Sequence, residues 1–276
     1  MESKVNSVST NNLVNELLCL ADSKWTLGHW YIKVMLNCRT LTDATAYAGM
    51  SQDELGHTRA LFSYMEEELD LPEHQLEFGR DVDTIHNMEL LDIPPQNRGD
   101  FLLTAFLAET ALWRFFATFK DGTNKALANL VVHCGKETWF HKLSVEGWLN
   151  CNNEEESAQM NAALPSRLPL ALDWFGYAEN DSLLDAGIRS VSMADARKLF
   201  VKEVLGNLVT IVDISDAELA ELMQSPQVDD YDPVRRRTQG TSMPDSLWEF
   251  MVPTSDEAKL ARRPLAVSIE DNIDLW

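Results

Sequence analysis

Basic residues are scarce in this chain of 276 residues, where 23 lysines and arginines stand against 44 aspartates and glutamates, giving a formal net charge of −21. Binding to nucleic-acid phosphates or to an anionic membrane needs a basic surface, so this balance argues against both. No run of 18 apolar residues is present, which argues against a transmembrane helix. The first ten residues also lack the basic-then-apolar order of a signal peptide.

Cysteine, glycine and proline are also sparse. The four cysteines lie far apart without a Cys-x-x-Cys pair, a pattern typical of reduced thiols, so we expect a cytoplasmic location. With 12 glycines, 10 prolines and 45% hydrophobic residues, the composition favours a largely helical globular protein. There is no Gly-rich phosphate loop, no Gly-x-Ser-x-Gly elbow and no His-Glu-x-x-His zinc helix.

Apolar residues at helical spacing predict four long helices, over residues 12–38, 41–69, 98–120 and 123–150. The polar connection 70–98, with His74 and His86 expected at its surface, is long enough to cross a bundle. This order of short and long connections predicts an all-α, ferritin-like four-helix bundle. Further helices are expected over 158–176, broken by Pro165 and Pro169, and over 181–206 and 216–224.

Three regions follow from this pattern: a disordered leader (1–11), a ferritin-like helical domain (12–225) and an extended C-terminal tail (226–276) that wraps the bundle or a partner subunit. The tail contains Arg235-Arg236-Arg237. These arginines either hold the phosphates of a CoA-type substrate or dock on the acidic surface of the protein itself.

The second predicted helix contains Glu54 and His57, whose spacing of three residues places both side chains on one face. The same face continues through Met50 and Leu61, so it points into the core. A buried carboxylate and a buried imidazole need partners. Glu-x-x-His segments on facing helices are the way in which di-iron carboxylate sites of helix bundles are built.

The other three long helices each add ionisable groups to a stripe that faces the core. Lys24 shares the face of Leu17 and Leu20, Glu109 is the one interior acid of its helix, and Glu137 and His141 are four residues apart. We therefore expect the four helices to direct these groups at one point of the bundle. The aromatic residues of the last two helices are interpreted as core, with a share lining an apolar substrate channel: Trp113, Phe115, Phe116, Phe119, Trp139 and Phe140.

Three segments resemble the catalytic subunit of the bacterial phenylacetyl-CoA monooxygenase (epoxidase): Gln52 to His57, Lys136 to Trp148, and Ser157 to Gly176. The start of the first helix, Leu20-Ala21-Asp22 with Leu27-Gly28, is more similar to the non-catalytic sister subunit. The resemblance covers roughly residues 15 to 205 and leaves both subunit types open.

Membership of this family implies a ferritin-like fold and, in catalytic members, two irons held by four carboxylates and two histidines. It also implies acyl-CoA thioester substrates, O2 as oxidant and a separate reductase. By this resemblance Glu54, His57, Glu109 and His141 match ligand positions. Lys24 stands at or next to the carboxylate of the first helix, and Thr138 replaces the carboxylate three residues before His141, with Glu137 one position away.

These departures leave three interpretations open. The cluster holds one or two irons that oxidise an acyl-CoA or related organic substrate with O2, or it holds a single metal with Lys24 in the vacated place. In the third, it is metal-free, with Lys24 ion-paired in place of metal, and the chain is a structural subunit of a catalytic homologue. A homo- or hetero-oligomer is expected in each case.

Overall fold

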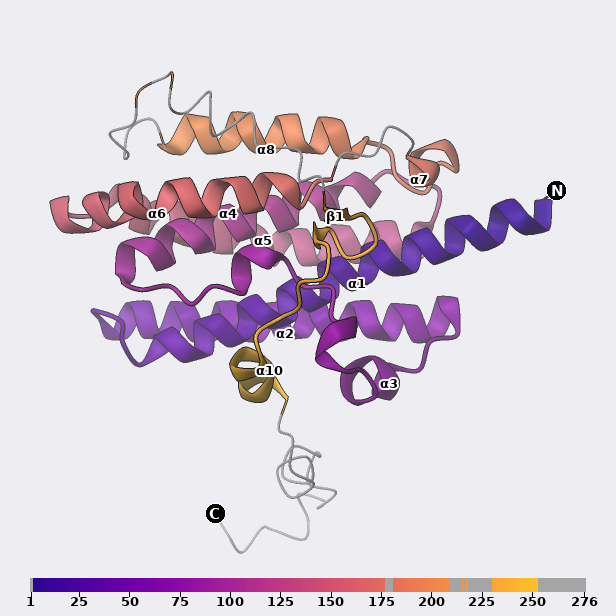
Figure 1. The fold of residues 1–276 in the computed structure, drawn as a ribbon, viewed down its shortest axis with the longest axis horizontal. Helices are drawn as coiled ribbons and strands as arrows, with labels where there is room; N and C mark the ends of the chain where they lie inside the picture. Colours follow the sequence, from indigo (N-terminus) through magenta and orange to yellow (C-terminus); the bar gives the residue numbers. More distant parts are fainter. Residues whose placement is uncertain (1, 177–180, 209–214, 216, 218–229, 253–276) are drawn as a thin grey trace, which may run out of the picture.

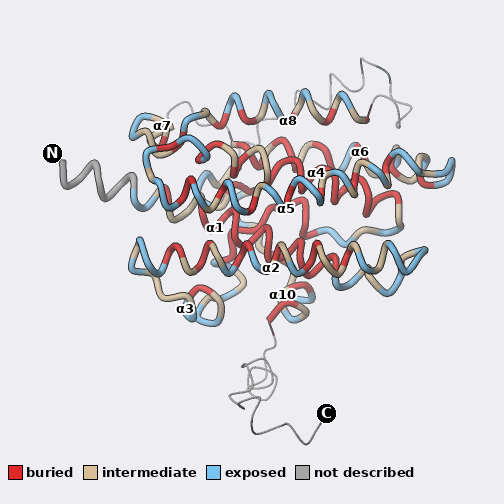
Figure 2. Tube along the Cα trace, turned by 180° about the vertical axis from the view of Figure 1, so that it is seen from behind, coloured by how far each residue is buried: buried red, intermediate tan, exposed pale blue. Residues whose placement is uncertain are grey.

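The computed structural model describes residues 2–176, 181–208, 215, 217 and 230–252. Four long helices form the bundle: α1 (Glu2–Met35), α2 (Leu41–Leu69), α4 (Arg98–Phe116) and α5 (Lys125–Asn150). Figure 2 shows that their buried positions gather where the helices face one another. The prediction of an all-α, ferritin-like bundle is confirmed.

Polar side chains fix where three of these helices begin. The Oγ1 atom of Thr40 accepts a hydrogen bond from the amide of Asp43 at the start of α2. Asn97 and Asn124 do the same for the amides of Asp100 and Leu127, in α4 and α5. Each cap satisfies one of the amides that the first helical turn leaves unpaired. The predicted boundaries therefore agree with the structure within a few residues.

The first helix differs from the prediction at its N-terminal end. Residues 2–11, assigned above to a disordered leader, belong to α1, which begins at Glu2. This segment contains neither glycine nor proline. Once a helix is nucleated, each added residue contributes one further hydrogen bond at small cost, so α1 extends toward the N-terminus, ahead of the predicted start at residue 12.

The connection between α2 and α4 is more buried than its polar composition predicts. It contains α3 (Glu73–Phe78) and two 3-10 turns, η1 (Val82–Thr84) and η2 (Glu89–Leu91). His74 is exposed, but His86 is only 7% exposed, so its predicted surface position is wrong. The cause is a set of hydrogen bonds to α1: the amide of His86 donates to Asp22 Oδ2, and Trp30 Nε1 donates to the carbonyl of Leu91.

Three further helices follow the bundle: α6 (Glu154–Asp173), α7 (Ser182–Asp185) and α8 (Met193–Leu208). The predicted break at Pro165 and Pro169 is wrong, because α6 runs through both prolines. Pro165 is exposed, while the neighbouring Arg167 is buried and donates from Nε and Nη2 to the two carboxylate oxygens of Asp100, at 2.8 and 2.9 Å. Packing and this bidentate pair hold α6 on α4.

The described part of the C-terminal tail contains a small hairpin, β1 (Tyr231–Asp232) and β2 (Arg237–Thr238), and a short helix, α10 (Asp245–Met251). It lies against the bundle (Figure 1). Arg236 and Arg237 form ion pairs with Glu16 and Asp92, and Arg235 donates to the carbonyl oxygen of Ile85 at 3.0 Å. The three arginines thus dock on the protein itself and are not free for substrate phosphates. The predicted helix 216–224 and residues 253–276 lie outside the described residues.

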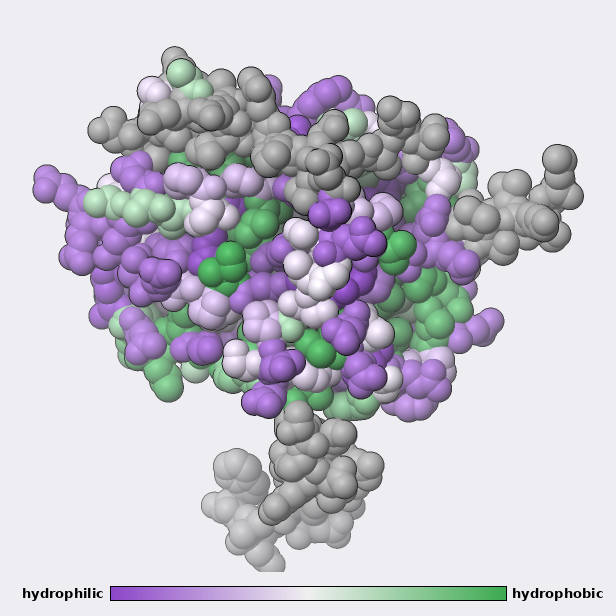
Figure 3. Space-filling model, in the orientation of Figure 1, coloured by the Kyte–Doolittle hydropathy of each residue, from purple (hydrophilic) through white to green (hydrophobic). Residues whose placement is uncertain are grey.

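One stretch, Arg98–Phe119 (α4 with the 3-10 turn η3, Ala117–Phe119), is long and apolar enough by composition to cross a membrane, and 83% of its apolar window is buried inside the fold. This is the position of an interior bundle helix. The face of the molecule in Figure 3 is mostly hydrophilic, in keeping with the high acidic content.

The predicted aromatic core is confirmed in α4 and η3 and wrong in α5. Phe115, Phe116 and Phe119 are buried, whereas Trp139 and Phe140 are 59% and 61% exposed. The reason is that α5 has apolar residues on its outer side as well as on its inner side, and periodicity alone does not distinguish them.

Candidate functional site

Four helices bring five ionisable side chains together in the centre of the bundle. Lys24 comes from α1, Glu54 and His57 from α2, Glu109 from α4 and His141 from α5, and each is at most 2% exposed. Helical spacing explains the arrangement, because each of these residues lies on the stripe of its helix that faces the core. The structure thus gathers the residues that the pattern singles out.

Lys24 lies between the two groups from α2. Its ammonium donates to Glu54 Oε1 at 3.1 Å and to Glu54 Oε2 at 2.9 Å, and it lies 3.3 Å from His57 Nδ1. Both oxygens of the carboxylate therefore face the same amine. This is a bidentate contact in a site with almost no solvent.

Glu109 lies on the other side of Glu54 and shares His141 with it. The Nδ1 atom of His141 lies 3.1 Å from Glu109 Oε1 and 3.3 Å from Glu54 Oε1, and the hydroxyl of Tyr31 donates to Glu109 Oε1 at 2.8 Å. The second oxygen of Glu109, Oε2, is buried without a hydrogen-bond partner in the described part of the chain. A buried carboxylate oxygen without a partner requires an explanation, and an ion bound there would supply one.

Two carboxylates at the edge of the cluster hold the outer nitrogens of the imidazoles. Glu137 Oε2 lies 2.7 Å from His57 Nε2, and Asp53 Oδ2 lies 3.1 Å from His141 Nε2, with both carboxylate side chains 39% exposed. Glu137 thus binds the far side of His57 and does not face the centre. Thr138, three residues before His141, is 2% exposed and brings no carboxylate to the cluster.

Sequence reasoning left Asp53 and Tyr31 out of the site. Tyr31 follows Lys24 by seven residues, two helical turns, so helical spacing predicts that it shares the face of Lys24, but spacing does not predict its hydrogen bond to Glu109. Asp53 directly precedes Glu54, and no spacing rule points it at the histidine of another helix.

Charge coupling inside the cluster sets the protonation of its members. Burial lowers the pKa of Lys24, but the charges of Glu54 and Glu109 outweigh this and raise it above its usual value. Burial raises the pKa of Glu54, and Lys24 and the two histidines more than reverse this, so that it lies well below the usual range.

Both imidazoles have raised pKa values despite their burial. For His57, burial and Lys24 lower the pKa, but hydrogen bonds with Cys134 and Glu54 and the charge of Glu54 raise it to about 9. For His141, burial is outweighed by the charge of Glu109 and by hydrogen bonds with Asp53, Glu109 and Glu54, and the pKa is about 12. The pKa values of Lys24, His57 and His141 are thus all raised, and the neighbouring acids favour the protonated form of each.

The donor set does not fit two irons. Two divalent ions need several carboxylates between them, and here only Glu54 and Glu109 face the centre, while Glu137 binds the outer nitrogen of His57. One ion fits better, because single ligand atoms of Glu54, Glu109 and His141 lie within 4.8 Å of one another. Oxygen and imidazole ligands suit iron and similar ions.

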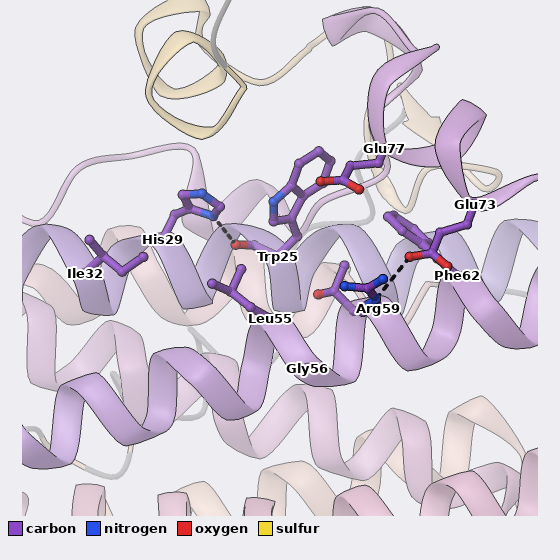
Figure 4. A pocket seen from close by; sticks show the side chains of 10 residues that line it. Trp25, His29, Ile32, Leu55, Gly56, Arg59, Phe62, Glu73 and Glu77 are labelled. Atoms are coloured by element: carbon purple, nitrogen blue, oxygen red, sulfur yellow. Dashed lines mark hydrogen bonds and ion pairs between the residues drawn. The ribbon is translucent and has the colours of Figure 1, made fainter. Parts of the chain in front are cut away.

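A separate hollow of about 520 Å³ lies on the other side of α1 and α2, under α3 (Figure 4). Its walls include Trp25, His29 and Phe62, with the Arg59–Glu73 ion pair at 3.3 Å on its rim. His29 Nδ1 lies 2.9 Å from the carbonyl oxygen of Trp25, so this histidine is engaged with its own helix and does not reach the cluster.

The fold and the site together define a class of protein: a ferritin-like helix bundle with a buried carboxylate–histidine cluster at its centre. The sequence profile of the phenylacetic acid catabolic protein family (PaaA_PaaC) matches residues 1–211, and the chain belongs to this family. Members are subunits of multicomponent phenylacetyl-CoA oxygenases. Among curated proteins, none matches this chain.

Proposed function

We propose that this chain is a structural subunit of an oxygenase complex acting on phenylacetyl-CoA or a related acyl thioester, with the Lys24 ammonium in the place of metal. The observation that carries the proposal is the contact of Lys24 Nζ with both oxygens of Glu54, at 2.9 and 3.1 Å, inside a fully buried site. The proposal includes a catalytic homologue that associates with this chain, a separate reductase and a cytoplasmic location.

The physical argument is competition for the same oxygens. A protonated amine and a divalent cation cannot both occupy the space in front of one buried carboxylate, since they repel each other strongly at low dielectric constant. Separating a buried ion pair costs about 3–5 kcal/mol. A metal at Glu54 has to overcome this cost, and the acids Glu16 and Asp22 of α1 are already paired with Arg236 and Arg80.

A second candidate function is oxidation at a single iron, and the unpartnered Glu109 Oε2 favours it. Glu54, Glu109 and His141 would hold the ion, which supplies O2 activation when bound and reduced. The Tyr31 hydroxyl fixes the orientation of Glu109, and Asp53 holds the outer nitrogen of His141. His141 has to lose its proton before its nitrogen can serve as a ligand.

Iron content of the purified full chain after anaerobic loading with Fe(II) separates the two candidates. The structural role predicts less than about 0.1 equivalent for the wild type and uptake of iron by Lys24→Glu, which replaces the amine by a ligand. Lys202→Glu, an exposed site on α8, is the control and should leave the iron content unchanged. About one equivalent in the wild type, lost in Glu109→Gln, would establish the single-iron function instead.

A further inference from the structure

The outer face of α5 has a composition that a solvated helix face normally lacks. Exposed positions of a bundle helix are usually polar. Here Trp139 is 59% exposed, Phe140 61%, Leu143 53% and Val132 45%. We call this face the α5 outer stripe; its positions alternate at spacings of three and four residues and are Asn129, Val132, Lys136, Trp139, Leu143, Glu146 and Asn150.

This spacing is the one by which two helices pack along a common seam. Residues that repeat at alternate intervals of three and four form the contact positions of a coiled coil. From Val132 to Asn150 the stripe is about 27 Å long at 1.5 Å per residue. In the described part of the chain no other helix covers it, and exposed positions follow α5 along its outside (Figure 2).

The sequence of the stripe is complementary to itself when reversed. If a second copy of α5 is laid antiparallel with its centre at position 141, Trp139 faces Leu143 of the other copy and Lys136 faces Glu146. The same pairs occur twice, once on each side of the two-fold axis, as an isologous contact requires. Lys136 and Glu146 form no ion pair with the described residues of their own chain.

A hollow lies beside the stripe, at the position that Trp139 of a second copy would reach in this antiparallel arrangement. It has a volume of about 190 Å³, and its walls are Trp113, Gly135, Trp139, Lys142, Leu143 and Glu146. Gly135 allows the indole of Trp113 to lie against α5, since a Cβ there would be 2.7 Å from the ring. Lys142 and Arg114 hold the outer wall through their ion pairs with Glu203.

We propose that the α5 outer stripe is the contact surface of a homodimer, in which two copies of this chain pack α5 against α5 in antiparallel orientation. The Trp139 side chain of each copy enters the hollow beside Leu143 of the other, and two Lys136–Glu146 pairs fix the register. With a net charge of −21 per chain, two copies repel at long range, so the contact depends on this apolar stripe and its two ion pairs. The proposal is independent of whether the buried cluster holds a metal.

Sedimentation of the full chain between about 1 and 100 µM tests the proposal, because an interface of modest size has a micromolar dissociation constant. The wild type should show a concentration-dependent dimer. Trp139→Lys should weaken dimerisation by at least about 30-fold, the effect of removing a central aromatic anchor. Leu36→Lys is the matched control, since Leu36 is 87% exposed, lies in the connection between α1 and α2 and is not part of the stripe.

Charge reversal tests the register and the identity of the partner. Lys136→Glu and Glu146→Lys each place like charges opposite one another in a homodimer, so each variant alone should be mostly monomeric. An equal mixture of the two should form a heterodimer, and the double variant K136E/E146K should form a homodimer again. Unchanged thermal unfolding midpoints of the variants, measured when monomeric, show that each is folded before it is mixed.

Three outcomes would overturn the homodimer. They are a wild type that stays monomeric over the whole range, a dimer that Trp139→Lys does not weaken, and a mixture of the two charge variants that associates no better than each alone. If the wild type does not pair with itself and its stripe binds a homologous chain instead, the homodimer is overturned by the first of these outcomes.

Discussion

The inner and outer faces of α5 each contain residues that such a face normally lacks. The inner face places His141 among buried carboxylates, while the outer face exposes Trp139, Phe140 and Leu143. A bundle helix ordinarily buries its apolar stripe and exposes its charges. The imidazole on the inner face is held by Asp53, Glu54 and Glu109 of neighbouring helices, whereas no helix of the described part of the chain covers the outer face. Four measurements sharpen or break this comparison.

The largest effect is expected when Lys24, the ammonium of the buried cluster that His141 of the inner face also joins, is replaced. Lys24→Met should lower the free energy of unfolding at pH 7 by about 3–5 kcal/mol, because it removes the ammonium that binds both oxygens of the buried Glu54 carboxylate. Chemical denaturation measures this loss. The double variant K24M/E54Q should lose clearly less than the sum of the two single changes, since the pair is removed as a unit. Strictly additive losses would show that the contact contributes little.

Next comes a matched pair of leucines on the two faces of α5. Leu149 is 1% exposed and Leu143 is 53% exposed. Leu149→Ala should cost about 3 kcal/mol of unfolding free energy, the usual cost of a buried cavity, while Leu143→Ala should stay within about 0.5 kcal/mol. Both are measured in the Lys136→Glu background, so that dimerisation does not add to stability. A large loss for Leu143→Ala there would place this residue in the core of the monomer.

The pH dependence of stability follows from the raised histidine pKa values. A group whose folded pKa lies above its unfolded value stabilises the fold fully below the unfolded value, and this contribution is lost as pH rises through the folded value. For His57 this window runs from 6.5 to about 9, and its contribution is at most about 3 kcal/mol.

Unfolding of metal-stripped protein in urea should therefore become easier from pH 6.5 to 9. His141 titrates over a window that begins at the same pH and extends to about 12, so His57→Gln should halve the slope and not remove it. Glu54, whose pKa is lowered, acts in the opposite direction: its contribution is present above 4.5 and is lost as the pH falls. A flat profile from pH 6.5 to 9 would show that the histidines are not charge-coupled.

The smallest effect is expected at the edge of the inner cluster. Tyr31→Phe removes the hydroxyl that donates to Glu109 Oε1 at 2.8 Å. The loss should be about 1.5 kcal/mol, as for a hydrogen bond to a charged acceptor. Tyr64→Phe is a control, because its hydroxyl accepts a hydrogen bond from the neutral amide of Asn124. Equal losses for both would mean that Tyr31 does not support the cluster.

How far the sequence predicts this molecule depends on the range of the interactions involved. The starts of α2, α4 and α5 follow from local caps, and Lys24, Glu54, Glu109 and His141 follow from periodicity within single helices. Contacts between distant residues are not visible in such patterns. The burial of His86 depends on Asp22, and the continuity of α6 through Pro165 depends on Asp100 in another helix.

The outer face of α5 illustrates a different limit. Trp139 and Phe140 fit a helical apolar pattern, but a helix that is apolar on two sides gives no information about which side faces the core. Lys24 shows what can be predicted from a single position. Its helical spacing places it inside the bundle, and its positive charge then favours contact with buried carboxylates.

The hairpin of the tail has a consequence for the order in which the chain is made. Arg236 and Arg237 are the partners of Glu16 and Asp92, acids that leave the ribosome long before them. Burial raises the pKa of Asp92 to about 6 even beside Arg237. A nascent chain that ends at residue 229 thus has every helix from α1 to α8, and Glu16 already pairs with Arg189 at 2.9 Å, but Asp92 still has no counter-charge. The hairpin therefore completes the charge pairing of the connection between α2 and α4, which is made long before it.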